Sequence, residues 1–189
     1  MGYNKINIIV ADESKKDLWN GYCVNKNFLP PLAVFEWKYI LETVYNADVL
    51  FLMALDNNAQ ACGVLPVYFI KDYSGKRMLF SLKYGFIIDE PSIGVQLIKY
   101  LTEHIKKMDV IYTNISSGLY QCELELKSNI NHTVVIDLPK NEEEMWKRFR
   151  DKVRNMVRKA KKNGITVEHG KGLINEFYSI YSDRMIEKG

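Results

Sequence analysis

Residues 141–164 read NEEEMWKRFRDKVRNMVRKAKKNG, and this stretch predicts one long amphipathic helix. Asn141 is a suitable N-cap, and Glu144 follows three residues later, as in a capping box. Gly164 suits the left-handed position that often follows the last helical turn. Apolar residues recur at helical spacing and define one packing face: Met145, Trp146, Phe149, Val153, Met156, Val157 and Ala160.

The other face of this predicted helix is strongly cationic. Its basic residues are Lys147, Arg148, Arg150, Lys152, Arg154, Arg158, Lys159, Lys161 and Lys162, and Asp151 is the one acid among them. A charge run is usually a solvated helix face, but such a face commonly mixes both signs through i,i+4 pairs. Anion binding explains the bias better, the anion being a phosphorylated small molecule, a lipid head group, RNA or a coenzyme A tail.

The composition is that of a packed, globular chain. It has 189 residues, 47% of them hydrophobic and 26% charged, enough for one domain or for one domain plus part of another. The formal net charge is only +3, so the cationic helix is a local feature. Cys23, Cys62 and Cys122 are odd in number and widely spaced, which indicates reduced thiols in a cytoplasmic protein. We expect no signal peptide and no transmembrane segment, because no apolar stretch approaches about 20 residues.

The order of the remaining segments predicts an α/β (mixed α+β) domain. Strands are expected at residues 7–10, 49–55, 60–70, 77–88, 110–115, near 122–126, 132–138 and 165–169. Further helices are expected after Ser14, from Trp37 to Tyr45, at residues 91–108 and at residues 173–188. Pro66 predicts an edge position or a bulge for its strand. Since regular βαβ alternation is absent, we expect a mixed sheet.

Motifs for other chemistries are missing. The chain has no phosphate-binding glycine loop and no nucleophile elbow, and His104, His132 and His169 lack metal-ligand spacing. The simpler interpretation of each histidine is a surface or partly buried side chain. Core packing is likewise the simpler interpretation of the aromatic residues that could instead line a pocket: Trp37, Tyr68, Tyr84, Tyr178 and Tyr181.

The cationic segment resembles a motif of FemAB-like proteins. From Lys152 to Val167 the sequence follows K-x-R-x-x-x-R-K-A-x-K-x-G-hydrophobic-x-V. Other similar features occur in the same order, namely Trp37 on an early helix, CGVLP at residues 62–66, LFS at 79–81 with Tyr84-Gly85 ahead of Asp89, and the strand at 132–138. FemAB-like proteins are bacterial-type acyltransferases built from two GNAT-like halves, where GNAT denotes the N-acetyltransferase type.

The resemblance implies a GNAT-like, largely antiparallel sheet flanked by helices. Residues 1–163 would form a first GNAT-like domain that includes the basic helix at 141–163, and residues 164–189 the opening strand and helix of a second, truncated domain. The GNAT signature Q/R-x-x-G-x-G/A, whose amides hold the coenzyme A pyrophosphate at a helix N-terminus, is absent. We therefore assign no cofactor to this chain alone.

The activity that the resemblance implies is transfer of an acyl or aminoacyl group to an amine. The donor would be acyl-coenzyme A or aminoacyl-tRNA, and the cations would hold a phosphate of the donor or acceptor. No catalytic residue is identified, and no metal is expected. The partners implied are a phosphate-bearing substrate, tRNA, and a second copy through the C-terminal strand and helix. The expected substrate-binding residues are Lys152, Arg154, Arg158, Lys159, Trp37 and Tyr84.

Two alternatives remain open from the sequence. One is a non-catalytic basic-helix module that binds RNA, a phosphorylated ligand or an anionic membrane surface. Such a module would lose affinity steeply with salt and would need no acyl donor. The other is a scaffold whose last strand and helix pack on a neighbour.

Overall fold

The computed structural model describes residues 6–26, 33–117 and 136–189 of the chain. The chain divides into two compact units, Met1–Ser128 and Asn129–Gly189. Several features predicted from the sequence lie outside the described residues: the strand near residues 122–126, Cys122, and His132 with the start of its strand.

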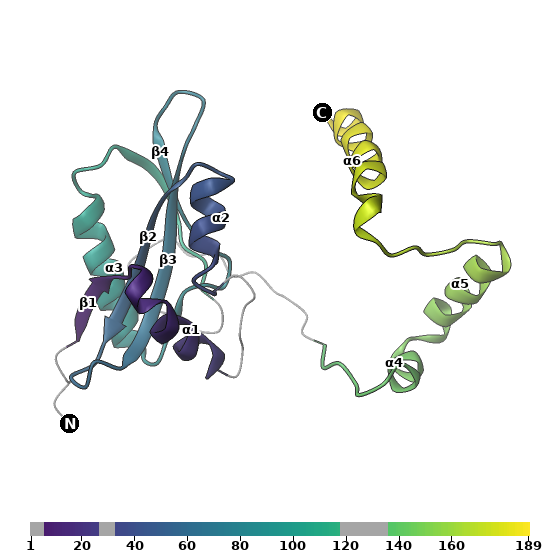
Figure 1. Cartoon of the computed structure of the whole chain (residues 1–189), viewed down its shortest axis with the longest axis horizontal. Helices are drawn as coiled ribbons and strands as arrows, with labels where there is room; N and C mark the ends of the chain where they lie inside the picture. Colours follow the sequence, from purple (N-terminus) through teal and green to yellow (C-terminus); the bar gives the residue numbers. More distant parts are fainter. Residues whose placement is uncertain (1–5, 27–32, 118–135) are drawn as a thin grey trace. The chain divides into compact units, whose positions relative to one another are not determined.

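The first unit is built on one mixed sheet (Figure 1). Its strands lie in the order β1 (Asn7–Val10), β2 (Asp48–Leu55), β3 (Ala61–Lys71), β4 (Arg77–Ser81) and β6 (Val110–Asn114), while β5 (Ile87–Ile88) pairs with β3. Among these described strands, β4 and β6 pair in parallel and the other pairs are antiparallel. The predicted mixed, largely antiparallel sheet is thus confirmed.

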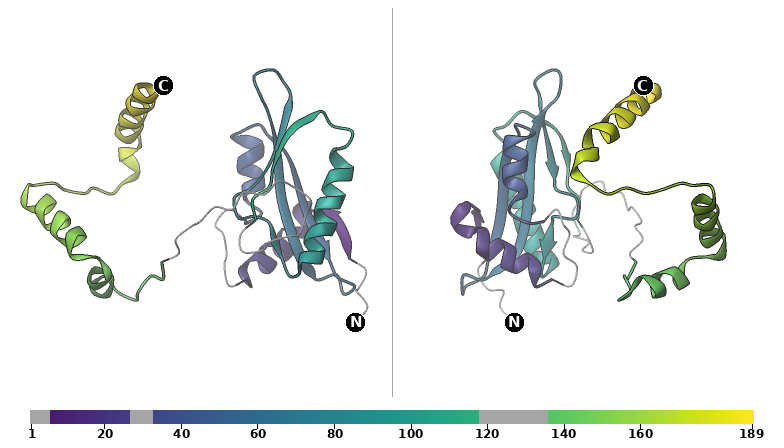
Figure 2. Two further views of the ribbon diagram at one scale, coloured as in Figure 1. Left: turned by 180° about the vertical axis from the view of Figure 1, so that it is seen from behind. Right: turned by 45° about the vertical axis from the view of Figure 1, so that its right-hand side comes forward.

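Helices cover both faces of this sheet. After the short 3-10 helix η1 (Glu13–Lys15), α1 (Lys16–Val24) and α2 (Trp37–Thr43) lie on one face, and α3 (Pro91–Ile105) lies on the other (Figures 1 and 2). Side chains of β2 alternate, so Phe51 packs with α1 and α2 whereas Leu52 packs with α3. Each face therefore has its own apolar core.

Of the two settings predicted for Pro66, an edge position or a bulge, the edge position is wrong, because Pro66 lies in the central strand β3. β3 pairs with β4 over residues 67–71 and with β5 over residues 63–64, and Pro66 lies where the partner changes. The Leu82 N–H donates to the Pro66 carbonyl at 3.1 Å. The missing N–H of Pro66 faces the same side as its carbonyl, where the chain bulges, so the sheet tolerates it. This bulge also splits the single strand predicted at residues 77–88 into β4 and β5.

The second unit contains α4 (Glu142–Arg148), α5 (Asp151–Lys162), the 3-10 helix η2 (Lys171–Leu173) and α6 (Ile174–Lys188). The predicted single helix at 141–164 is therefore wrong. Phe149 and Arg150 have ψ angles of 140° and 149°, which take the chain out of the helical conformation for two residues. Phe149 packs edge-on against Trp146, with ring centroids 6.2 Å apart, and Asp151 then starts a new first turn.

The described residues of two predicted strands of this unit do not form strands. Residues 165–169, and the described part of the strand predicted at 132–138, have no strand pairing and are exposed. An alternating pattern such as that of Ile165 and Val167 forms a strand only against a partner strand, and the described residues of this unit contain none. The helix predicted at residues 173–188 is confirmed, but none of the side chains described in this unit is buried. The domain boundary expected at residue 163 stays a prediction.

Candidate functional site

The cationic side chains predicted to bind substrate lie on α5, next to a corner with α4. The N-cap of α4 is as predicted, because the Glu144 N–H donates to Asn141 Oδ1 at 2.9 Å. Across the break, the Arg158 guanidinium lies 5.7 Å from the centroid of the Trp146 ring. Arg154 donates to the Lys147 carbonyl at 3.5 Å. These contacts tie the two helices together through two of the predicted binding residues.

The structure separates the four predicted cations into two pairs. Arg154 forms an ion pair with Asp151, which holds the pKa of that carboxyl below its usual value through a hydrogen bond and charge attraction. Arg158 donates to Asn155 Oδ1 at 2.9 Å. Lys152 and Lys159 are exposed and make no hydrogen bond or ion pair within the described parts of the chain. Seven residues apart, they project from nearly the same side of the helix.

Trp37 and Tyr84, the two predicted pocket walls, belong to the first unit. Trp37 opens α2 and is half-buried against the core beneath that helix. Tyr84 lies in the bulge between β4 and β5 with a left-handed φ of 59°, and its N–H donates weakly to Ser116 Oγ at 3.5 Å. Lys83 Nζ lies 5.1 Å from the centroid of the Tyr84 ring. The contacts of both side chains lie within the first unit, and their role as walls of a pocket stays a prediction.

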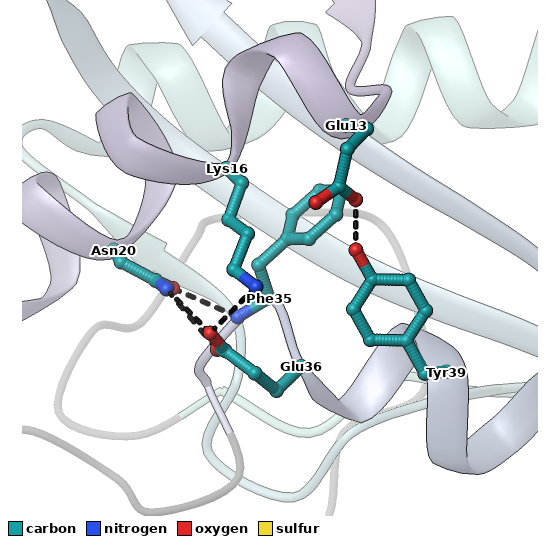
Figure 3. A network of polar contacts seen from close by, with 6 residues as sticks. All are labelled: Glu13, Lys16, Asn20, Phe35, Glu36 and Tyr39. Atoms are coloured by element: carbon teal, nitrogen blue, oxygen red, sulfur yellow. Dashed lines mark hydrogen bonds and ion pairs between the residues drawn. The ribbon is translucent and has the colours of Figure 1, made fainter.

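A network of polar contacts holds α1 to the segment that leads into α2 (Figure 3). Asn20 Oδ1 accepts from the Phe35 N–H at 2.9 Å, and Asn20 Nδ2 donates to the Glu36 carboxylate at 3.1 Å. Lys16 Nζ lies 3.1 Å from the same carboxylate. The pKa of Glu36 is lowered first by a hydrogen bond from its own backbone and then by Asn20 and Lys16. Because Trp37 follows Glu36 directly, this network fixes where α2 begins.

Three aromatic rings form a row across neighbouring strands of the first unit. Tyr68 on β3 stacks on Phe80 on β4 at 5.9 Å between ring centroids, and Phe80 contacts Tyr112 on β6 at 5.7 Å. Asn114 Nδ2 lies 3.4 Å from the Tyr112 hydroxyl. The sequence singled out Tyr68 but not Phe80 or Tyr112. Strand alternation in β4 and β6 is the signal that could have placed them on one face.

A second polar cluster joins α1 to the start of α3. The buried Tyr22 hydroxyl lies 3.0 Å from Asp89 Oδ1 and 3.0 Å from the Cys62 carbonyl oxygen. Lys26 forms an ion pair with Asp89, and its Nζ lies 4.5 Å from the centroid of the Tyr22 ring. Burial raises the pKa of the Tyr22 phenol, and the Asp89 charge raises it further. Tyr22 therefore acts as a neutral hydrogen-bond donor.

The two described cysteines are buried thiols. Burial raises the pKa of Cys23 to about 12 and that of Cys62 to about 11. Because the thiolate is the nucleophilic form of cysteine, neither side chain is suited to covalent catalysis near neutral pH.

The described ranges contain neither a metal-type cluster nor a membrane-spanning helix. No three histidine, cysteine, aspartate or glutamate side chains there are grouped so that they could hold a metal ion. None of the helices described combines the length and the apolar character needed to cross a membrane.

Comparison with protein families matches residues 89–186, more than half of the chain, to the FemAB family. Comparison with curated proteins finds no match. A Trypanosoma brucei acetyltransferase is 14% identical with a TM-score of 0.50, and the match covers 71% of this chain and 100% of that one. Glucosamine-6-phosphate N-acetyltransferase from Arabidopsis thaliana gives 14% identity, coverages of 70% and 99%, and a TM-score of 0.48. A GNAT family acetyltransferase from Staphylococcus aureus is 16% identical with a TM-score of 0.44, and the match covers 68% of this chain and 98% of that one.

At these identities the solved structures bear on the fold alone. The likeness to the Trypanosoma brucei acetyltransferase, with a TM-score of 0.50, concerns the fold. The expected GNAT-like sheet, mixed and largely antiparallel with helices on both faces, is confirmed.

Proposed function

The chain belongs to the FemAB family, and from this premise we propose that it transfers an acyl or aminoacyl group to an amine acceptor. The acetyltransferase-type sheet of the first unit supports the proposal, since it is the scaffold expected for such a transfer. Family membership does not favour the alternative of a binding module without catalytic activity.

The observation that carries the proposal is the cationic side of α5, which lies inside the family match. Acyl transfer requires an oriented amine, removal of its proton and stabilisation of an oxyanion. Phosphates remote from the reacting atoms can supply the orienting energy, because charge-assisted hydrogen bonds to them are strong. Lys152 and Lys159 are exposed cations that are available for this task.

Arg154 and Arg158 complete the proposed binding residues. A guanidinium has five N–H donors, so Arg158 can lie against Trp146 and still donate to a phosphate. Arg154 positions the first turn of α5 through Asp151 and Lys147. Trp37 and Tyr84 are proposed as walls for the apolar part of the substrate. We assign no general base.

The proposed reactants are a donor, either acyl-coenzyme A or aminoacyl-tRNA, and an acceptor that carries an amine. At least one of them bears phosphate, in keeping with the charge of α5. Residues 1–163 and 164–189 are proposed as a first domain and the opening of a second, and the C-terminal segment as a contact between two copies.

A transfer assay tests the proposal. The full chain is incubated with acetyl-coenzyme A or alanyl-tRNA and a panel of primary amines with and without a phosphate group, and acylated products are detected by mass spectrometry. We expect products with phosphate-bearing reactants, and a slower rate in Lys152→Ala/Lys159→Ala than in the control Lys99→Ala/Lys107→Ala, whose lysines are exposed on the first unit. Absence of product with both donors, or equal rates in the two variants, would overturn it.

A further inference from the structure

The acetyltransferase fold implies a coenzyme A diphosphate at the N-terminus of a helix that follows a central strand, and in this chain that helix is α3. β5 pairs with the central strand β3 and ends at Ile88, and α3 begins at Pro91. Within the described part of the first unit, no other helix follows a strand that pairs with β3 so directly. We infer that the N-terminus of α3 does not bind a coenzyme A diphosphate. The inference rests on the proposed function, because it limits where the donor can be held.

The charge at this helix end has the wrong sign for a diphosphate. Asp89 and Glu90 immediately precede Pro91, the first residue of α3, and the chain has no lysine or arginine from residue 84 to residue 98. Glu90 is the N-cap residue, with φ −139° and ψ 148°. Two carboxylates at this position already complement the positive end of the helix dipole. A diphosphate placed there would meet like charges instead of the amide-lined, electropositive turn that anions require.

Several backbone positions at this helix end cannot donate to an anion or already donate within the protein. Pro91 has no N–H to offer. The Ile93 N–H donates to the Glu90 carbonyl at 3.0 Å, and the Asp89 N–H donates to the Cys62 carbonyl at 3.0 Å. A phosphate cradle needs several N–H groups converging on one point, usually from a glycine-rich turn. Here Pro91 stands in the first turn, and the first glycine of the helix is the buried Gly94.

Lys26, the cation beside this helix end, is already paired within the protein. Lys26 pairs with Asp89 and lies over the Tyr22 ring, with the side chains of Lys26 and Asp89 only 26% and 38% exposed. Because Tyr22 is buried and lies in reach of both Asp89 and the Cys62 carbonyl, the cluster is continuous with the core. The C-terminal end of α1 thus occupies one side of the turn that precedes α3. A phosphate-bearing donor must therefore be held by other residues.

Backbone amide NMR tests this directly. The uniformly ¹⁵N-labelled full chain is titrated with coenzyme A, and separately with inorganic pyrophosphate, while the amide shifts are followed. We expect the amides of Ser92, Ile93 and Gly94 to stay unchanged up to about 1 mM ligand, which corresponds to a binding free energy weaker than roughly −4 kcal/mol. Saturable shifts of these three amides, with a dissociation constant below that concentration, would overturn the inference.

The amides of α5 serve as an internal comparison in the same spectra. Shifts at residues 152–162 without shifts at residues 92–94 support both the inference and the proposed phosphate binding. If the amide shifts change neither at residues 92–94 nor at residues 152–162, the inference is upheld and the proposed role of α5 is contradicted. The variant Lys152→Ala/Lys159→Ala is the matched control, since it should reduce the α5 shifts and leave residues 92–94 as in the unaltered chain.

Discussion

Removal of the Tyr22 hydroxyl, in the variant Tyr22→Phe, should destabilise the first unit by about 1.5 kcal/mol. The ring stays, so apolar burial is unchanged and the hydroxyl alone is tested. Its loss removes a donor that lies 3.0 Å from both the Asp89 carboxylate and the Cys62 carbonyl. A hydrogen bond to a charged group contributes about 1.5–3 kcal/mol. Asp89 keeps Lys26 as a partner and is partly open to water, so the low end of this range applies.

Urea unfolding at pH 7 measures the effect on the free energy of unfolding. Tryptophan fluorescence in a Trp146→Phe background confines the signal to the first unit, which contains the other two tryptophans. An unchanged m-value together with a lower midpoint would indicate a true loss of stability. The control is Tyr39→Phe, whose hydroxyl meets Glu13 at the surface, and its cost should stay within about 0.5 kcal/mol. If Tyr22→Phe costs no more than Tyr39→Phe, the cluster does not anchor α1 and the reasoning fails.

Two further predictions concern packing and pH. In Gly63→Ala the new Cβ would lie 2.8 Å from Ile93 Cγ2, so we expect the free energy of unfolding in urea to fall by about 1–3 kcal/mol. The control is Gly21→Ala on α1, whose new Cβ meets no atom within 4 Å and which should be neutral or stabilising. Similar losses in the two variants would contradict the packing argument. Cys23 and Cys62 have pKa values raised to about 12 and about 11, so the unfolded thiols ionise above pH 9.0 while the folded thiols stay protonated. Their contribution to stability is therefore complete below about pH 9 and falls as the pH rises towards 11 and 12. In a Cys122→Ser background a thiol reagent at pH 8 should label the protein only after unfolding, and rapid labelling of the folded protein would refute their burial.

The fold of the first unit was largely predictable because its elements carry local signals. The continuous apolar run of β2 reflects burial on both faces of the sheet, whereas the regular apolar stripe of α3 reflects burial of one helix face. The split between β4 and β5 was not predictable, since it depends on how Pro66 meets Leu82 across the sheet. In the second unit, the strand predicted at 165–169 failed because strand formation depends on a partner that a local pattern does not reveal.

The candidate site was predictable in charge but not in arrangement. The pair Asp151 and Arg154 is an i,i+3 contact that sequence spacing can suggest. The contact of Arg158 with Trp146 crosses the break between α4 and α5, which helical periodicity hides. Tyr22 and Asp89 are 67 residues apart, so no local pattern links them.

The claim on which the proposed function depends is that Lys152 and Lys159 of α5 bind phosphate. Calorimetric titration of the full chain with inorganic pyrophosphate at low ionic strength measures this directly. The account predicts saturable binding that weakens about tenfold in Lys152→Ala/Lys159→Ala, because two charge-assisted contacts are lost, and less than about twofold in Lys99→Ala/Lys107→Ala. Absence of saturable binding, or an equal loss in the two double variants, would contradict it.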